Sequence, residues 1–198
     1  MNRDYLLCGV GGQGTILASK LLADAALNSG NKVCATETIG MSQRGGSVVS
    51  HVRVGSDTYS PMIPYGMAQV LIAFEPAEAV RNLPYLAENG VLVVAKKAVK
   101  PITATLSGDN YDGSNMISYL KENVKNLVIV DGETICANLG SNKVLNVVLL
   151  GAASASNMLG FSVSEMQEVI EKRVPQKFIN LNRSALQAGA SVVMSEVK

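Results

Sequence analysis

The stretch that decides the fold is residues 5–15, which read Tyr-Leu-Leu-Cys-Gly-Val-Gly-Gly-Gln-Gly-Thr. The apolar run over residues 5–8 predicts a buried strand, and the glycines after it have the G-x-G-x-x-G spacing. Leucine and alanine then recur on one side of a helix predicted over residues 13–29, which a glycine–asparagine pair ends. Residues 32–36 are a second short strand. This order predicts a Rossmann-like βαβ start with parallel strands.

An antiparallel hairpin is expected after this start. Residues 47–54 alternate between apolar and polar side chains, as in a strand with one less apolar face. A turn at residues 55–57 leads into residues 58–60, which we expect to form the second arm, and Pro61 and Pro64 end it. This hairpin would add antiparallel strands to a parallel core.

The rest of the chain alternates apolar strands with helices and contains no repeat, low-complexity tract or linker. We therefore predict an α/β fold with three layers, whose mostly parallel sheet has a Rossmann-like start and an added antiparallel hairpin. Residues 1–198 are expected to form a single domain. The remaining predicted elements are strands at 70–74, 91–95 and 127–130, and helices at 77–88, 115–122, 133–139, 142–158, 164–173 with Ser164 as its N-cap, and about 182–188.

The composition excludes several classes of protein. The chain has 198 residues, with 17 Lys+Arg against 16 Asp+Glu, so its net charge of +1 gives no general attraction to nucleic acid or to an anionic membrane. The apolar stretch 144–159 is interrupted by polar residues and glycine, which indicates a buried helix rather than a membrane span. The N-terminus lacks the pattern of a secretory signal, so we expect a cytoplasmic protein. A charged fraction of only 17% favours a subunit with large partner surfaces.

The residues that commonly hold metals are few and scattered. Cys8, Cys34 and Cys136 are isolated from one another and lie in apolar surroundings, as buried thiols do. The single histidine, His51, lies in an alternating segment. We therefore expect no metal site, no iron–sulfur cluster and no histidine-based catalytic triad within this chain.

The first candidate site is the glycine turn. Glycine can adopt a positive φ and lets a ligand or another chain approach closely, while the amides that open the following helix favour an anion. Three interpretations stay open: a dinucleotide site completed by Glu37, a site for another anion, or a turn that serves packing alone. The candidate residues are Gly9, Gly11, Gly12, Gln13, Gly14, Thr15 and Glu37.

The second candidate site is the loop after the second strand, which we expect at the same end of the sheet as the glycine turn. Its arginine can direct a planar guanidinium at a carboxylate or phosphate, unless it is only an exposed side chain on a flexible loop. Glu75 and Asp131 end strands and could line the same cleft, but acidic residues at helix N-termini commonly interact only with the helix dipole, so we expect both to be structural. No nucleophile–base pair is evident. The candidate residues of the loop are Ser42, Gln43, Arg44, Gly45 and Gly46.

Taken together, these motifs resemble the gamma-type domain of 2-oxoacid:ferredoxin oxidoreductases over nearly the whole chain. The form of residues 41–47 is most similar to the small beta subunit of the indolepyruvate type, although Ile39 stands where that type favours histidine. Subunits that act on 2-oxoglutarate, pyruvate or branched 2-oxoacids are similar enough to stay open. The motifs are residues 9–14, 37–48, 60–61 with 63–64, 74–76, 83–86, 146–151 and 175–177.

The resemblance implies a reaction and a set of partners. It implies oxidative decarboxylation of a 2-oxoacid with coenzyme A, giving an acyl-CoA, carbon dioxide and reduced ferredoxin. Thiamine diphosphate and iron–sulfur clusters would be carried by one or more larger subunits, and the isolated chain would be inactive and hold no cofactor by itself. The two glycine-containing loops would face the thiamine-bearing subunit, with Arg44 and the amides of residues 12–15 favouring anionic groups. A homodimer is left open.

Two other classes of protein remain as alternatives at this point. One is an independent α/β protein that binds NAD(P) or FAD at the G-x-G-x-x-G turn. The other is an assembly module without a ligand, whose loops serve packing alone. Titration of the chain with NAD, FAD or coenzyme A would separate the first alternative from a subunit of a larger enzyme.

Overall fold

The computed structural model describes residues 2–39, 45–56, 58–100 and 111–196 of the chain. In this part of the chain six strands form one sheet in the order β2-β3-β1-β4-β5-β6. β1, β4, β5 and β6 pair in parallel, whereas β3 lies antiparallel between β1 and β2. The strands are β1 (Arg3–Val10), β2 (Val33–Ile39), β3 (Ser47–Val54), β4 (Ala68–Ala73), β5 (Leu86–Ala95) and β6 (Asn126–Val130).

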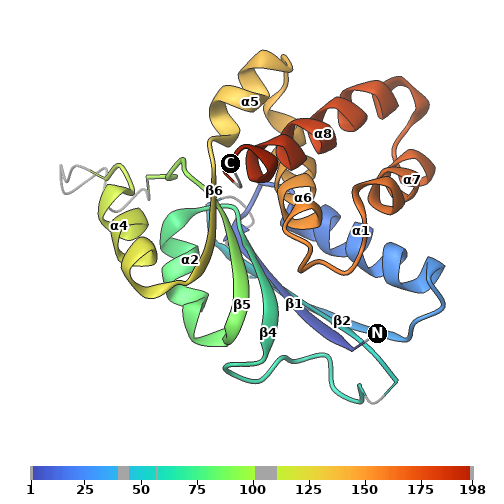
Figure 1. Cartoon of the computed structure of the whole chain (residues 1–198), viewed down its shortest axis with the longest axis horizontal. Coiled ribbons are helices and arrows are strands. Elements are labelled where there is room, and N and C mark those ends of the chain that lie inside the picture. The colour runs from blue at the N-terminus through green and yellow to red at the C-terminus, as the bar shows by residue number, and fades with distance from the viewer. Residues whose placement is uncertain (1, 40–44, 57, 101–110, 197–198) are drawn as a thin grey trace.

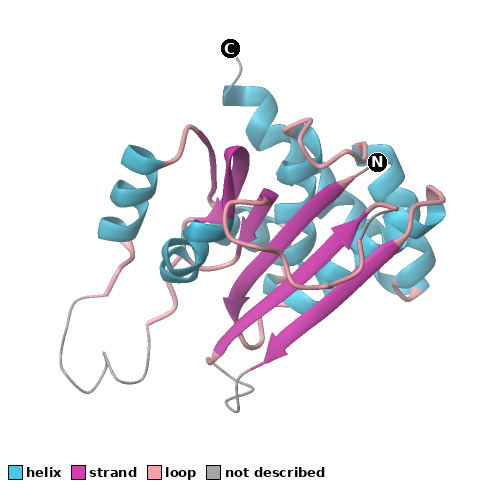
Figure 2. Cartoon of the chain, turned by 90° about the horizontal axis from the view of Figure 1, so that it is seen from below, coloured by secondary structure: helices cyan, strands magenta, loops and turns pink. Residues whose placement is uncertain are grey.

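Helices cover both faces of the sheet (Figure 1). α1, α6, α7 and α8 lie on one face, α2 and α4 lie on the other, and α5 follows the end of β6 and packs against α6. Figure 2 shows the same layers from below, with a loop crossing the sheet face beside α2. The helices are α1 (Thr15–Asn28), α2 (Pro76–Asn82), η1 (Leu83–Tyr85), α4 (Ser114–Asn123), α5 (Gly132–Asn138), η2 (Asn142–Val144), α6 (Leu145–Ala155), α7 (Val163–Arg173), η3 (Gln176–Phe178) and α8 (Ile179–Glu196).

β1 explains why the fold has three layers. Tyr5 and Leu7 belong to the apolar core shared with α1 and α6, while Leu6 and Cys8 belong to the core shared with α2 and α4. Successive side chains of a strand point to opposite faces, so a continuous apolar run requires cover on both sides of the sheet. The predicted α/β fold with a mostly parallel sheet is confirmed.

The order of the first three strands differs from the prediction. In a Rossmann-like βαβ start the two strands lie side by side, but here β3 is inserted between β1 and β2 and pairs antiparallel with both. The hairpin is therefore formed by β2 and β3, whose arms are joined by residues 40–46. Hydrophobic periodicity identifies a strand but not its neighbours, which explains the error.

The predicted second arm of the hairpin is wrong. Residues 58–60 are described and lie outside any strand. The Arg53 guanidinium donates to the carbonyl oxygens of Ser60 and Met62, at 3.1 and 3.2 Å. A side chain rather than a neighbouring strand thus takes these acceptors, and Pro61 between them has no N–H to give to a ladder.

Several helix boundaries also differ from the predictions. α2 ends at Asn82, well before residue 88, because Pro84 cannot supply the N–H that a longer helix needs. The N-cap of α7 is Ser162 rather than Ser164, and Ser162 forms a capping box with Glu165. α8 runs from residue 179 to 196, beyond the predicted 182–188, because Gly189 packs against α6 instead of ending the helix. Within the described residues, no helix is long and apolar enough to cross a bilayer.

Candidate functional site

The glycine turn connects the carboxyl end of β1 to the first residue of α1. Gly12 has φ 101° and Gly14 has φ 85°, values that favour glycine over any residue with a Cβ atom. Gly14 is the N-cap of α1 and caps it without a side chain. The first amides of a helix point out of its N-terminal end, which in α1 adjoins the turn, and they favour a negative charge there.

Gln13 fastens this turn to the neighbouring strand. Its side-chain oxygen accepts from the Val10 amide at 2.8 Å, and its side-chain nitrogen donates to the Phe74 carbonyl, just beyond β4, at 2.9 Å. A Cβ atom on Gly9 would lie 2.7 Å from the Gln13 oxygen and 2.8 Å from the Phe74 Cβ. Gly9 is thus required for packing, and both ends of the Gln13 amide are engaged within the chain.

The second predicted loop meets the first, as far as the described residues extend. The Gly11 amide donates to the Gly46 carbonyl at 2.8 Å, and the Gly45 amide donates to the Gly11 carbonyl at 3.3 Å. Gly45 has φ 75°. The predicted site residues Ser42, Gln43 and Arg44 lie outside the described residues. The two loops are therefore joined by backbone hydrogen bonds, and the chain leads directly from this junction to Arg44.

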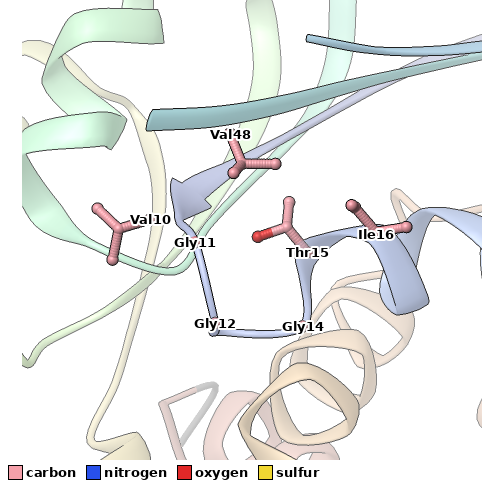
Figure 3. Close-up of a pocket in the computed structure, with 7 residues that line it drawn as sticks. All are labelled: Val10, Gly11, Gly12, Gly14, Thr15, Ile16 and Val48. Carbon is pink, nitrogen blue, oxygen red and sulfur yellow. The ribbon is translucent and has the colours of Figure 1, made fainter. Parts of the chain in front are cut away.

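A cavity of about 510 Å³ lies beside the turn (Figure 3). Thr15, the first residue of α1, is only 3% exposed, and its hydroxyl points from the helix toward the end of β1. This hydroxyl has no hydrogen-bond partner among the described residues. A buried hydroxyl without a partner is costly, and this one lies on a residue that helps to line the cavity. The lining residues are Val10, Gly11, Gly12, Gly14, Thr15, Ile16 and Val48.

Glu37 lies away from this cavity. It is on β2, separated from β1 by the whole width of β3, and the Ser19 hydroxyl of α1 donates to its carboxylate at 3.4 Å. Two strand spacings amount to about 9–10 Å. In the dinucleotide-binding arrangement the strand bearing the ribose-binding acid lies next to β1, so the inserted β3 removes the geometry on which that interpretation of Glu37 rested.

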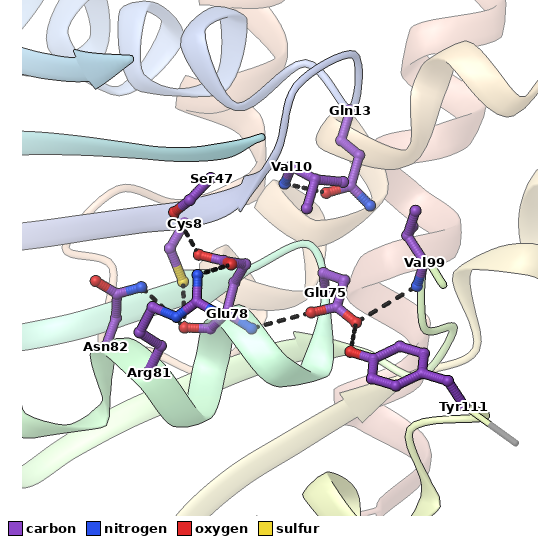
Figure 4. A network of polar contacts seen from close by, with 10 residues as sticks. All are labelled: Cys8, Val10, Gln13, Ser47, Glu75, Glu78, Arg81, Asn82, Val99 and Tyr111. Atoms are coloured by element: carbon purple, nitrogen blue, oxygen red, sulfur yellow. Dashed lines mark hydrogen bonds and ion pairs between the residues drawn. The ribbon is translucent and has the colours of Figure 1, made fainter. Parts of the chain in front are cut away.

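A buried polar network lies on the other side of the junction (Figure 4). Glu75 and Glu78, at the start of α2, are 2% and 4% exposed. Glu75 accepts from the Glu78 amide at 3.0 Å and so caps α2, which is a structural role, and it accepts from the Tyr111 hydroxyl at 2.9 Å. Burial, together with the hydrogen bond to Glu75, raises the pKa of Tyr111. The Tyr111 hydroxyl therefore stays protonated and donates to the carboxylate.

Glu78 is the residue that the sequence analysis missed. Its carboxylate accepts from the Ser47 hydroxyl at 2.6 Å and from the Arg81 guanidinium at 2.7 Å. The only signal in the sequence was an acidic residue within the apolar stretch Ala77–Val80 of a short helix. Asp131, like Glu75, caps a helix, by accepting from the Thr134 amide.

The described residues offer no donor set for a metal or cluster. They bring no three histidine, cysteine or acidic side chains together in a way that could hold a metal ion. Cys8 and Cys136 are buried and Cys34 is half-buried. Burial raises the pKa of the Cys8 thiol, with further contributions from Glu78 and Glu75, and burial also raises the pKa of Cys136. These two thiols are protonated, unreactive core residues, and an iron–sulfur cluster does not fit the described part of the chain.

Comparisons with known proteins agree on one family. The family model for pyruvate ferredoxin/flavodoxin oxidoreductase matches residues 4–192. The indolepyruvate oxidoreductase subunit IorB of Pyrococcus horikoshii is 36% identical over 188 residues, which cover 94% of this chain and 93% of that protein. The pyruvate/ketoisovalerate oxidoreductases common subunit gamma of Pyrococcus furiosus is 26% identical over 165 residues, 82% of each chain.

A solved structure gives the same result for the fold. The gamma subunit of a keto/oxoacid ferredoxin oxidoreductase from Geobacter sulfurreducens is 26% identical and superposes with a TM-score of 0.69, covering 98% of this chain and 99% of that one. These matches do not support an independent nucleotide-binding protein. The chain belongs to the pyruvate ferredoxin/flavodoxin oxidoreductase family, as a small subunit of the 2-oxoacid:ferredoxin oxidoreductase type.

Proposed function

We propose that this chain is the small subunit of an indolepyruvate-type oxidoreductase. The observation that carries the proposal is its higher identity to the indolepyruvate subunit than to the pyruvate/ketoisovalerate gamma subunit, over a larger share of the chain. The form of residues 41–47 supports the same substrate class. The substrate would then be a 2-oxoacid with a large aromatic side chain.

The reaction we propose for the complex is a coenzyme A-dependent oxidative decarboxylation. The bond between the oxo carbon and the carboxylate breaks and releases carbon dioxide, the acyl carbon bonds to the coenzyme A sulfur, and the thiol proton is released. The electron pair leaves one electron at a time through iron–sulfur clusters to ferredoxin. Thiamine diphosphate, on a larger subunit, would stabilise the carbanion that decarboxylation generates. The isolated small subunit is expected to be inactive.

Within this complex we assign the two glycine-containing loops to the face that meets the thiamine-bearing subunit. The amides that open α1, next to the buried and unpartnered hydroxyl of Thr15, favour an anionic group of coenzyme A or of the 2-oxoacid in the adjacent cavity. Arg44 would add a guanidinium for the same anion, because it lies one residue before Gly45, which bonds to the turn. The candidate residues would thus bind and orient a substrate whose chemistry takes place on the partner.

The remaining parts of the proposal concern partners and location. The larger subunits would carry thiamine diphosphate and the iron–sulfur clusters, and ferredoxin would dock on the complex rather than on this chain alone. A second copy of the chain within the complex is left open, as it is from the sequence. We place the complex in the cytoplasm, and the free thiols of Cys8 and Cys136 support a reducing compartment.

Anaerobic purification of the tagged chain from its native cells tests the proposal. We expect a larger subunit with thiamine diphosphate and iron–sulfur clusters to copurify, and the complex to reduce ferredoxin faster with indolepyruvate than with pyruvate, 2-oxoisovalerate or 2-oxoglutarate. A complex that prefers one of the last three acids would overturn the substrate class. A chain that purifies alone and binds a nucleotide tightly would overturn the subunit role.

The Arg44→Ala variant tests the assignment of the loops. We expect assembly to persist and the KM for coenzyme A or for the 2-oxoacid to rise at least tenfold, since a charge-assisted hydrogen bond contributes about 1.5–3 kcal/mol. Arg183→Ala is the matched control, because Arg183 of α8 forms a surface ion pair with Glu171 of α7. Unchanged assembly and unchanged turnover in Arg44→Ala would refute the assignment.

A further inference from the structure

Two anchors from the corner between β4 and α2 reach the two loops of the candidate site, and Figure 4 shows the second of them, from Glu78 to Ser47. The Phe74 carbonyl, just beyond β4, receives the Gln13 side chain and so holds the first loop. The Glu78 carboxylate, in the first turn of α2, receives the Ser47 hydroxyl. Ser47 is the first residue of β3 and follows Gly46 directly. The same corner therefore fixes both sides of the junction.

The path from Glu78 to the glycine turn is short and consists of defined contacts. Ser47 donates to Glu78 at 2.6 Å, the adjacent Gly46 accepts from the Gly11 amide at 2.8 Å, and Gly11 belongs to the turn. Gly45 and Gly46 have no side chains with which to anchor themselves. Their position depends on the backbone bonds to Gly11, on the pairing of Ser47 with Val10 in the β1–β3 ladder, and on the hydrogen bond that fixes the Ser47 side chain.

A carboxylate is well suited to this place. Glu78 must accept from Ser47 and from Arg81 at the same time, and an ionised carboxylate is an acceptor at both oxygens. A carboxamide has one oxygen and would have to turn its NH₂ group toward one of the two donors. Hydrogen bonds to a charged acceptor are also the stronger kind, which compensates for the burial of Glu78.

We propose that Glu78 is a positioning residue for the reaction of the complex: through Ser47 it holds Gly45 and Gly46 against Gly11 and thereby sets the distance between the two loops. Glu78 touches no reacting group. This inference rests on the proposed function, because that proposal assigns the loops to substrate binding. It adds a residue outside both loops, on α2, that controls their geometry.

Substitutions at Ser47 in the assembled complex provide the first test. Ser47→Ala removes the link but leaves Glu78 paired with Arg81, so the fold should persist. Arg44→Ala is expected to raise the KM of one substrate. Ser47→Ala should raise the KM of the same substrate about tenfold and change kcat less than twofold. Ser47→Thr keeps the hydroxyl and should restore KM. Ser191→Ala is the matched control, since the hydroxyl of this exposed serine donates to the Gln187 carbonyl of its own helix, and the substitution should leave KM unchanged.

A double-mutant cycle identifies Glu78 as the partner. Glu78→Gln should raise the same KM, and the combination with Ser47→Ala should raise it little further, because both changes break one link. Effects that multiply would show that Glu78 and Ser47 act independently and would overturn the inference. So would a Ser47→Ala complex whose KM and Gly11 amide exchange both match the unsubstituted complex.

Hydrogen exchange separates failure of this inference from failure of the proposed function. The Gly11 amide is bonded to Gly46, so its exchange in the complex should accelerate in Ser47→Ala whether or not a ligand binds there. Faster exchange with an unchanged KM would support the link and refute the assignment of the loops to substrate. A raised KM in Arg44→Ala, with neither KM nor exchange altered in Ser47→Ala, would support the loops and refute the role of Glu78.

Discussion

Where α6 crosses α8, glycine is required because space is absent, whereas at the turn after β1 glycine is required although space is present. A Cβ atom on Gly151 would lie 2.1 Å from the Leu186 carbonyl oxygen, and one on Gly189 would lie 1.9 Å from the Val148 carbonyl oxygen. A Cβ atom on Gly12 would meet nothing within 4 Å among the described atoms, but Gly12 has φ 101°. Glycine is needed for close packing in one region and for a positive φ in the other.

The two regions therefore differ in what a substitution should disturb. The crossing of α6 and α8 is a close contact between apolar helices in the main core, so a substitution there should lower the free energy of unfolding. The turn borders the cavity beside Thr15 and is held by polar contacts, so a substitution there should first weaken substrate binding. Substitutions in each region can establish or break this distinction.

Gly151→Ala should have the largest effect on stability. The added methyl group would meet backbone rather than a flexible side chain, so α6 and α8 must move apart, which costs about 3 kcal/mol. Urea-induced unfolding followed by circular dichroism would measure the change. Gly140→Ala is the control, because Gly140 has a positive φ but open space around it and should cost only about 1 kcal/mol. Equal losses in the two variants would contradict the packing explanation.

Gly12→Ala should have the next largest effect, divided differently between stability and function. The positive φ should cost about 2 kcal/mol in unfolding free energy, either by strain or by a local change of the turn. In the complex, we also expect the KM of the anion-bearing substrate to rise. Loss of stability alone would leave the KM of the folded enzyme unchanged. A steady-state assay with the assembled complex measures KM. A normal KM in a destabilised variant would mean that the turn serves packing alone.

The sequence was sufficient to predict features that depend on local pattern. The apolar run of β1, the glycine turn and the helix after it were predicted because each has its own periodicity or composition. The meeting of the Gly45–Gly46 segment with the turn also followed, because the carboxyl ends of β1 and β2 lie at the same end of the sheet.

What could not be predicted depends on register between distant segments. Ser47 and Glu78 are 31 residues apart and meet only because β3 lies beside β1 and α2 packs at its end. No local pattern shows whether β1 has β2 or β3 as its neighbour in the sheet. Glu37, on β2, was therefore expected closer to the turn than it lies. The predicted extent of α8 was wrong for a related reason. Glycine has a low helix propensity, but Gly189 lies within α8 because it packs against α6.

Gln13 allows a smaller test of the polar contacts that hold the turn after β1. Gln13→Ala removes the bonds to the Val10 amide and the Phe74 carbonyl and should destabilise the chain by about 1 kcal/mol. Gln13→Glu keeps an acceptor for Val10 but turns a carboxylate oxygen toward the Phe74 carbonyl, so it should cost more than alanine. Unfolding in urea measures both variants. A glutamate variant as stable as the original chain would show that the bond to Phe74 contributes nothing.

His51 gives the smallest expected effect and extends the comparison to a buried polar group outside the candidate site. It is 2% exposed, and its Nδ1 atom accepts from the Ile63 amide at 3.2 Å. Burial, with a smaller contribution from Arg53, lowers the pKa of His51 below its ordinary value. The folded chain therefore favours the neutral imidazole, whereas the unfolded chain binds a proton at about pH 6.5.

The sign of the pH dependence follows from this difference. Between the lowered pKa of the folded chain and about pH 6.5, the unfolded chain binds more protons, so the unfolding free energy should fall as the pH falls and be constant with respect to this group above that range. Urea unfolding at several pH values measures the slope, which cannot exceed that of one proton. In His51→Gln the side-chain oxygen can still accept from Ile63 but cannot titrate, so this part of the slope should disappear. An unchanged slope would assign the pH dependence to the carboxylates instead, and would show that a buried polar group outside the candidate site contributes to packing without responding to pH.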